Sequence, residues 1–219
     1  MKNIKGAIFD LDGTLLDTIP DLKIAINEAG KFLGYKEINR EDILPHFGNG
    51  VYNLFNGLFP IVNGNDELLN KALDIYQKKY DECCTVNTKK YDGIDDVLDY
   101  LVRKGIKLAV FSNKPDKSVK EIIAFYFPNV KFEIVLGQRK GYPVKPDPKS
   151  LDDIFSAFNL HANEVVEIGD GRPDFLLTKN TGMQHISCLW GYNPKELLMD
   201  VGAKNFAKTP DEIKRYLWN

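Results

Sequence analysis

The stretch FDLDGTLLDT, residues 9–18, places three aspartates directly after a short apolar run. Asp10 and Asp12 stand two residues apart, Gly13 follows at once, and Asp17 comes near the end of the stretch. Carboxylates held close together raise one another's pKa unless a cation shares the site. A carboxylate can also attack an electrophile, and a second carboxylate can transfer protons. The pattern therefore indicates a cation site combined with carboxylate chemistry.

Further polar residues follow other apolar runs. KLAVFSN brings Ser112, VKPDP brings Lys145, and EVVEIGD ends in Asp170, with Asp174 four residues later. A hard divalent cation would neutralise clustered carboxylates, and Mg²⁺ is predicted because it needs only one or two of them and keeps waters. The Ser112 hydroxyl and the Lys145 charge suit an anion with several oxygens, such as a phosphoryl group. Together these groups predict phosphoryl transfer.

The elements that would position these residues alternate between strand and helix from Tyr91 onward. Apolar runs of strand length are expected at Ile4–Asp10, Lys107–Asn113, Phe132–Gly137, Glu164–Asp170 and Gln184–Leu189. Amphipathic helix patterns lie between them, and the alternation implies right-handed crossovers in a parallel sheet covered on both faces. Ligands bind beyond the carboxyl ends of such strands, so the polar residues are expected to meet there.

One region interrupts the alternation. Between Asp17 and about Lys89 the patterns predict helices only, and an insert of roughly 70 residues can form a small bundle of its own. The predicted fold is α/β, a Rossmann-like parallel sheet core with an inserted helical cap domain. The core domain is expected to comprise residues 1–16 and 89–219, and the cap residues 17–88.

Composition excludes several classes of partner. Lys and Arg total 29 against 31 Asp and Glu, so the net charge of −2 predicts neither a nucleic acid nor a membrane partner. The three cysteines match neither a metal-binding nor a disulfide pattern, which predicts reduced thiols in a cytoplasmic protein. Asp10 and Asp12 interrupt the N-terminal apolar run, which argues against a signal peptide. A monomer or homodimer is expected.

The motifs resemble those of a known family. DLDGTLLDT, FSNK, VKPDP and IGDGRPD, in this order, resemble the four motifs of the haloacid dehalogenase superfamily of phosphohydrolases. LLDTIPDL, HFGNGVYNLF and YDGIDDVLDYLVRKGIKLAVFSNK resemble its phosphoglycolate phosphatase-like branch, so the match covers nearly the whole chain. In that branch the helical insert is a mobile cap over the site.

The resemblance implies a role for each matched residue. Asp10 is the expected nucleophile, Asp12 the acid/base, and Ser112 and Lys145 the groups that hold the phosphoryl oxygens. The expected metal ligands are Asp10, Asp12 (through its backbone carbonyl), Asp170 and Asp174, the last directly or through water. Mg²⁺ is the expected cofactor.

Four residues are expected to bind substrate. Thr14 and Asn113 stand beside the catalytic residues in their motifs. Asn49 and Gly50 belong to HFGNG in the insert, where glycine permits close backbone approach and the following helix N-terminus offers donors to an anion. The alternative for HFGNG is a simple turn between two helices.

The predicted function is a magnesium-dependent phosphatase that hydrolyses a small phosphorylated metabolite through an aspartyl phosphate. A phosphomutase of the same superfamily, a pyrophosphatase and a nucleotidase are the alternatives. The mutase branch carries a histidine four positions after the residue matched by Thr18, and this chain has Leu22 there, which favours hydrolysis. Asp12 argues against a dehalogenase or a phosphonate hydrolase. A phospho-receiver module would carry its phosphorylated aspartate after the third strand, where this chain has Gly137.

Overall fold

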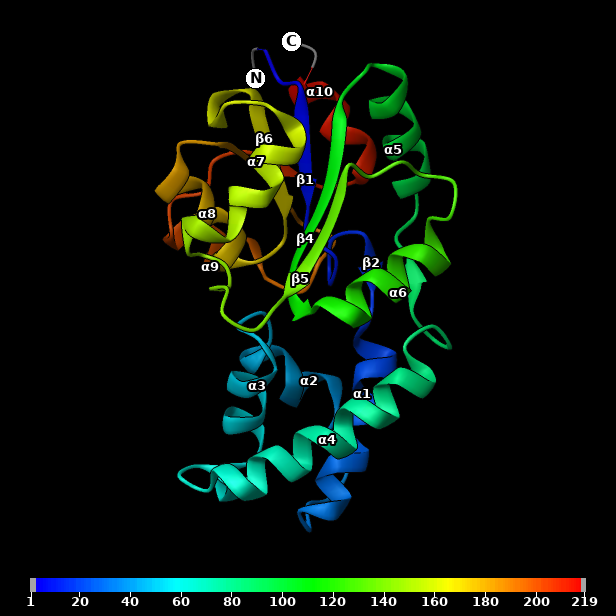
Figure 1. Ribbon diagram of the computed structural model, residues 1–219, viewed down its shortest axis with the longest axis vertical. Helices are drawn as coiled ribbons and strands as arrows, with labels where there is room; N and C mark the ends of the chain where they lie inside the picture. The colour runs from blue at the N-terminus through cyan, green and yellow to red at the C-terminus, as the bar shows by residue number, and fades with distance from the viewer. Residues whose placement is uncertain (1–2, 218–219) are drawn as a thin grey trace. The chain divides into compact units, whose positions relative to one another are not determined.

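The computed structural model describes residues 3–217, and the chain divides into two compact units (Figure 1). Unit 1 comprises Met1–Asp17 and Lys90–Asn219, and unit 2 comprises Thr18–Lys89. Each of the two domain boundaries expected from the sequence lies one residue before the corresponding boundary in the structure. Among the described residues, no helix combines the length and the apolar character that a membrane span requires.

Unit 1 is built around one parallel sheet, as the alternation of strands and helices predicts. In spatial order its strands are β5 (Ile134–Gln138), β4 (Lys107–Pro115), β1 (Gly6–Phe9), β6 (Val165–Gly169), β7 (Gln184–Cys188) and β8 (Phe206–Ala207). All the pairings between these neighbours are parallel, which confirms the predicted α/β fold. The edge strand β8 was not predicted, because two residues are too short to show a strand pattern.

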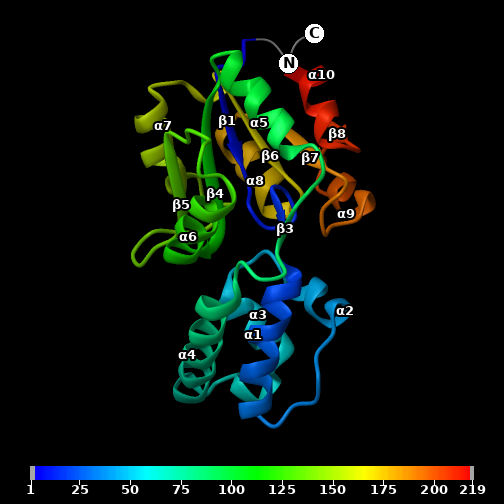
Figure 2. The ribbon, with the colours of Figure 1, turned by 90° about the vertical axis from the view of Figure 1, so that its right-hand side faces the viewer.

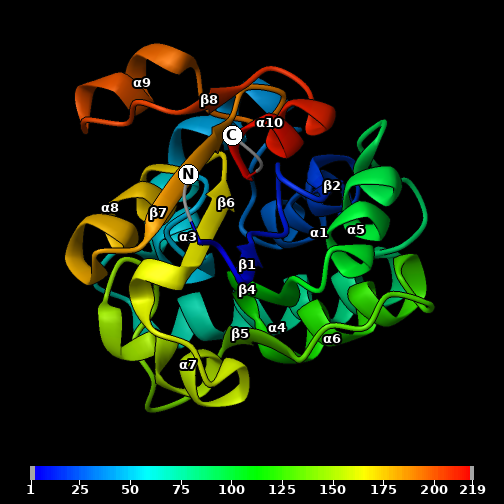
Figure 3. The same ribbon diagram turned by 90° about the horizontal axis from the view of Figure 1, so that it is seen from above.

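Helices cover both faces of this sheet. The helices of unit 1 are α5 (Ile94–Arg103), α6 (Asp116–Tyr126), α7 (Asp152–Phe158), α8 (Arg172–Thr181), α9 (Lys195–Asp200) and α10 (Ile213–Leu217), with 3₁₀ turns at Pro148–Leu151, Ala162–Glu164 and Pro210–Glu212. Figures 1 and 3 show α7 and α8 on one face of the strands and α5 and α6 on the other. This two-sided covering explains why the central strands are largely apolar rather than alternating.

Apolar side chains from strands and helices meet under α7 and α8. This core cluster contains Ile8, Ala109, Phe111, Leu136, Leu151, Ile154, Phe158, Val165, Leu177 and Met183. Each fully buried side chain of this size stabilises the fold by about 1.5–3 kcal/mol. Gly6 lets α7 approach β1, since a Cβ there would lie 2.9 Å from the Phe158 ring. The core fixes the strand ends that carry the polar residues.

Unit 2 is entirely helical between its ends (Figure 2). It contains α1 (Ile19–Phe32), α2 (Arg40–Ile43), α3 (Val51–Leu58) and α4 (Asp66–Cys83), with 3₁₀ turns at Leu44–His46 and Pro60–Val62. Buried aromatic rings form its core: Phe55 lies 5.2 Å from Phe59 and 5.3 Å from Tyr76, which stacks on Tyr80. The Asn65 side chain caps α4 by accepting a hydrogen bond from Leu68 N.

The chain leaves and re-enters unit 1 through two very short strands, β2 (Leu16–Asp17) and β3 (Lys89–Lys90), which pair with each other. Within unit 2, the buried carboxylate of Asp21 accepts hydrogen bonds from Asn87 N, Asn87 Nδ2 and Thr88 N at 2.8–3.0 Å. Asp21 thereby ties the first turn of α1 to the returning segment. Neither short strand was predicted from the sequence.

Candidate active site

The polar strand ends meet where the strand order of the sheet reverses. β1 lies between β4 and β6, and the chain moves outward from β1 in both directions. Asp10 directly follows β1, Ser112 lies near the end of β4, and Asp170 directly follows β6. Such a switch point leaves a crevice at the carboxyl ends of the strands, which is where α/β proteins bind ligands.

Lys145 contacts several of the polar groups in this crevice. Its ammonium group lies 2.8 Å from Asp10 Oδ1 and 2.6 Å from Asp174 Oδ1, and it donates to the Phe111 carbonyl at 2.8 Å. The lysine is buried, and the carboxylates hold its pKa above its usual range despite the cost of desolvation. The sequence places Lys145 in a loop far from all three partners, and the fold brings them together.

Asn113 positions Lys145 through the backbone. Its Oδ1 accepts from Lys145 N at 2.8 Å, and its Nδ2 donates to Lys145 O at 3.2 Å. The amide of Asn113, expected to bind substrate, is thus engaged with the loop that carries the lysine. We interpret Asn113 as a positioning residue.

Three carboxylates form a cluster beside the lysine. One oxygen each from Asp10, Asp170 and Asp174 lies within 4.8 Å of the others, and all three residues are buried. Asp170 accepts hydrogen bonds from Thr14 Oγ1 at 3.0 Å and from Tyr192 N at 2.7 Å. The hydroxyl of Thr14 therefore orients a carboxylate, and substrate binding by Thr14 stays a prediction.

Glycines make room for this cluster. Gly13 has φ +86°, and a Cβ there would lie 2.5 Å from an Asp170 oxygen. A Cβ at Gly191 would overlap Asp170 as well. Gly13 belongs to the first motif noted in the sequence, whereas Gly191 lies after β7 and was missed. Both keep the backbone close to the carboxylate without strain.

Burial and mutual repulsion raise the pKa values of the cluster. Desolvation is the largest cause for Asp10, whose pKa is raised to about 8, and for Asp170, whose pKa is raised to about 7; repulsion by neighbouring carboxylates adds to both. All three donors are carboxylate oxygens, the ligand type that Mg²⁺ prefers. Buried, mutually repelling carboxylates with this donor chemistry fit a hard divalent cation.

The raised pKa values predict how stability depends on pH. From about pH 6.5, Asp10 and Asp170 lose their protons progressively as the pH rises toward 8 in the folded, metal-free protein, whereas both are already ionised in the unfolded chain. Because the folded state then binds more protons, the free energy of unfolding should fall as pH rises through this window. The pKa of His185 is lowered by burial to about 4, so this residue costs stability only below its usual value of about 6.5, outside the window.

The measurement is the melting temperature in EDTA at several pH values, with Asp10→Asn as the control variant. The wild type should melt at a lower temperature at pH 8 than at pH 6.5, and the variant should show a shallower slope. Mg²⁺ should reduce the slope by stabilising the ionised carboxylates. A melting temperature that rises across the window would contradict the assignment.

Asp12 faces β4 rather than the carboxylate cluster. Its Oδ1 lies 2.7 Å from Lys114 Nζ, and its Oδ2 accepts a long hydrogen bond from Ser112 Oγ at 3.5 Å. The expected acid/base and the expected phosphoryl-binding hydroxyl are therefore neighbours. Lys114 was noted at this strand end, but no role was assigned to it from the sequence.

A further carboxyl group, besides those of Asp10 and Asp174, lies near Lys145. Glu167 in β6 is fully buried, 4.0 Å from Lys145 Nζ, and neither of its oxygens has a hydrogen-bond partner among the described residues. Desolvation raises its pKa well above its usual value, so burial favours the neutral form of the side chain. Its neighbour in β7 is His185, whose Nε2 bonds Ser187 Oγ. A glutamate inside an apolar strand was the sequence signal for this feature.

Asn49 and Gly50 lie in unit 2. Gly50, with φ +83°, is the N-cap of α3, and Asn49 O accepts a hydrogen bond from Asn53 Nδ2 at 2.8 Å. The segment thus begins a helix, which both interpretations of HFGNG anticipate. Substrate binding by Asn49 and Gly50 stays a prediction.

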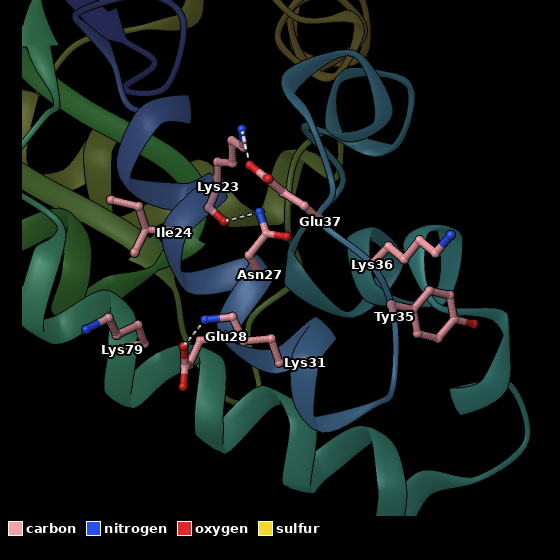
Figure 4. Close-up of a pocket in the computed structure, with 9 residues that line it drawn as sticks. All are labelled: Lys23, Ile24, Asn27, Glu28, Lys31, Tyr35, Lys36, Glu37 and Lys79. Carbon is pink, nitrogen blue, oxygen red and sulfur yellow. Dashed lines mark hydrogen bonds and ion pairs between the residues drawn. The ribbon is translucent and has the colours of Figure 1, made fainter.

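Unit 2 also carries a groove of about 640 Å³ along α1, shown in Figure 4. Lysines and glutamates line much of it, and they pair with one another: Lys23 lies 2.9 Å from Glu37, and Lys31 lies 3.3 Å from Glu28. Surface pairs of this kind contribute little energy. We assign no chemistry to this groove.

Comparison with known proteins agrees with this geometry. The model of the haloacid dehalogenase-like hydrolase family matches residues 7–188. A phosphoglycolate phosphatase from Vibrio parahaemolyticus is 30% identical, over 99% of this chain and 96% of the relative. One from Vibrio cholerae is 31% identical, over 90% of this chain and 89% of the relative.

A solved structure gives the same result. The crystal structure of a candidate phosphoglycolate phosphatase from Lactobacillus delbrueckii subsp. bulgaricus superimposes with a TM-score of 0.90 at 29% identity, covering 100% of both chains. The family match spans Asp10, Ser112, Lys145 and Asp170. The chain therefore belongs to the haloacid dehalogenase-like hydrolase family, within its phosphoglycolate phosphatase-like branch, and is a phosphoric monoester hydrolase.

Proposed function

We propose that this protein is a magnesium-dependent phosphatase that hydrolyses a small phosphorylated metabolite of the phosphoglycolate type through an aspartyl phosphate. The observation that carries the proposal is the buried cluster in which Lys145 meets Asp10 and Asp174 while Asp170 completes a set of three carboxylates. A nucleophile, an anion-binding cation and a divalent-cation site lie together in one crevice. The relatives named phosphoglycolate phosphatase support the substrate class.

The chemistry takes two steps. A carboxylate oxygen of Asp10 attacks phosphorus, the bond from phosphorus to the leaving oxygen breaks, and Asp12 gives that oxygen a proton. Water then attacks phosphorus of the aspartyl phosphate, Asp12 takes the proton of the water, and inorganic phosphate leaves with Asp10 restored. Asp12 thus ends the cycle as it began.

Other residues stabilise the charge that develops. Lys145 and Ser112 hold phosphoryl oxygens, as their position beside Asp10 and Asp12 allows. Asp10, Asp170 and Asp174 would hold Mg²⁺ through side chains, and Asp12 through its backbone carbonyl. The ion, when bound, supplies positive charge that offsets the negative charge of the phosphoryl group. Thr14, Asn113 and Tyr192 keep these groups in place.

The same proposal places the enzyme in the cytoplasm, as a monomer or homodimer acting on soluble metabolites. The support is that Cys83, Cys84 and Cys188 are free thiols.

The test is hydrolysis of p-nitrophenyl phosphate and 2-phosphoglycolate after treatment with EDTA and again after Mg²⁺ is restored. Activity should be lost in EDTA and return with Mg²⁺, and Asp170→Ala should need more than about tenfold higher Mg²⁺ because one anionic ligand is gone. Calorimetric titration of Mg²⁺ should show the same weakening independently of turnover. Ca²⁺ should inhibit, because its longer and looser coordination misplaces the nucleophile.

Asp99→Ala is the control, since Asp99 is an exposed aspartate on α5 of the same unit. Its Mg²⁺ requirement should match the wild type. Full activity of the wild type in EDTA would exclude the metal-assisted mechanism.

A further inference from the structure

Lys114 and Asp12 form an ion pair that the proposed chemistry does not use. The two charged atoms lie 2.7 Å apart, and the side chains are only 4% and 8% exposed. Lys114 N also donates to Ser112 Oγ at 3.3 Å, so the lysine is placed by the same strand end as the phosphoryl-binding serine. The pair lies inside the site.

This pair occupies the atoms that Asp12 needs for catalysis. Oδ1 of Asp12 is in contact with Lys114, and Oδ2 is the acceptor of the Ser112 hydroxyl. The leaving oxygen of a substrate must hydrogen-bond to one of these carboxyl oxygens to receive its proton. A leaving oxygen bonded to Asp12 therefore competes with Lys114 and Ser112 for the lone pairs of the carboxylate and lies next to one of them.

An anion on the substrate is the group best suited to take Lys114 away from Asp12. Separating a buried ammonium from its counter-ion is costly unless another anion replaces that counter-ion. Since a hydrogen bond spans about 2.8 Å, a leaving oxygen bonded to Asp12 lies within about two such lengths of Lys114 Nζ. An acidic group one or two carbon atoms beyond the leaving oxygen would therefore lie within reach of the lysine.

Two other cations of unit 1 make their contacts with other groups than Asp12. Lys145 already contacts Asp10, Asp174 and the Phe111 carbonyl. Arg139 pairs with Asp153 at 2.8 Å and stacks on a tyrosine ring. Lys114 is the cation in contact with the acid/base itself.

We propose that Lys114 recognises a second anionic group, carried by the leaving group of the substrate, and that this contact releases Asp12 to act on the leaving oxygen. The inference rests on the proposed function and deepens it. It assigns a specificity-determining residue for the proposed class of substrate. A substrate with a neutral leaving group leaves Lys114 on Asp12 and is turned over less well.

The test compares two substrates that differ in the second anion. 2-Phosphoglycolate carries a carboxylate where ethyl phosphate carries a methyl group, so the ratio of their kcat/KM values isolates recognition of that carboxylate. Lys114→Met should lower this ratio by about 10–100-fold, the range typical of a lost hydrogen bond between charged groups. Lys114→Arg keeps the positive charge, so it should retain part of the preference for 2-phosphoglycolate over ethyl phosphate.

Lys117→Met is the matched control. Lys117 lies three residues further along on α6, is 65% exposed and pairs with Glu121 at 3.8 Å. The ratio of kcat/KM for 2-phosphoglycolate to that for ethyl phosphate should be the same in Lys117→Met as in the wild type. Inhibition by inorganic phosphate, which fills only the phosphoryl site, checks that the site in each Lys114 variant is folded.

The outcomes separate this inference from the function on which it rests. A wild type that hydrolyses neither ester in Mg²⁺ would overturn both. An active wild type together with an unchanged ratio in Lys114→Met would overturn the role of Lys114 alone. Equal losses on both esters would also overturn it, because Lys114 would then serve the shared phosphoryl chemistry.

Discussion

Asp10→Asn is expected to reduce kcat by about 10⁴-fold or more while the protein stays folded. The amide nitrogen and oxygen of asparagine do not attack phosphorus, so no covalent intermediate can form. The change also removes one of the three clustered carboxylates and a counter-ion of Lys145. Because every substrate passes through the attack by Asp10, the loss should affect every substrate.

The fold should tolerate this substitution. Asparagine has the size of aspartate, burial raises the pKa of Asp10 to about 8 and so reduces the cost of a neutral side chain, and Asp174 still pairs with Lys145 at 2.6 Å. The melting temperature in EDTA near pH 7.5 should therefore equal or exceed that of the wild type. Asp99→Asn, an exposed change on α5, serves as the control for loss of a single carboxylate.

The measurement pairs steady-state kinetics with covalent labelling. Wild-type protein quenched in acid during turnover of ³²P-labelled substrate should carry label on Asp10, and the variant should carry none. A folded Asp10→Asn protein with wild-type kcat would disprove the nucleophilic role. Label on another residue in the wild type would move the nucleophile elsewhere.

Asp12→Asn is expected to lower kcat by about 10²–10⁴-fold, the usual contribution of general acid–base catalysis. With p-nitrophenyl phosphate the first step needs little help, because the leaving group is already a weak base. The second step still needs a base to take the proton of the attacking water. The aspartyl phosphate should therefore accumulate on Asp10.

Intact-protein mass spectrometry during turnover should detect that accumulation as one added phosphoryl group. Asparagine keeps the size of the side chain near Ser112 and Lys114, which limits structural disturbance. Adding Asp10→Asn should abolish the added mass, which identifies its site. Hydrolysis of the intermediate at the wild-type rate would remove Asp12 from the role of base.

Much of this protein could be predicted from local patterns in the sequence. Apolar runs of strand length that alternate with amphipathic helices predicted the parallel α/β sheet, and the structure confirms it. The four motifs predicted the family, which the family match confirms. Asp10, Ser112 and Asp170 were singled out because each lies at or directly after a strand end, and in a parallel sheet those ends share one edge.

Other features were outside the reach of such patterns. β2, β3 and β8 have two residues each, too few to show a period. Thr14 and Asn113 are polar residues beside catalytic ones, so the sequence suggested contact with substrate. In the structure, side-chain hydrogen bonds of these residues go to Asp170 and to the Lys145 backbone, which local patterns could not show, and contact with substrate stays a prediction.

The sequence by itself determined which residue types are present and which element each one follows. Only the tertiary structure decided which of them meet. Lys145 reaches Asp10 across 135 positions of the chain, and Lys114 reaches Asp12 across 102. Spacing within one helix or strand carries no information about such contacts, because they depend on the strand order and on how the loops cross the edge of the sheet. The same packing buries the carboxylates of Asp10 and Asp170, and that burial raises their pKa values and makes the site suited to a cation.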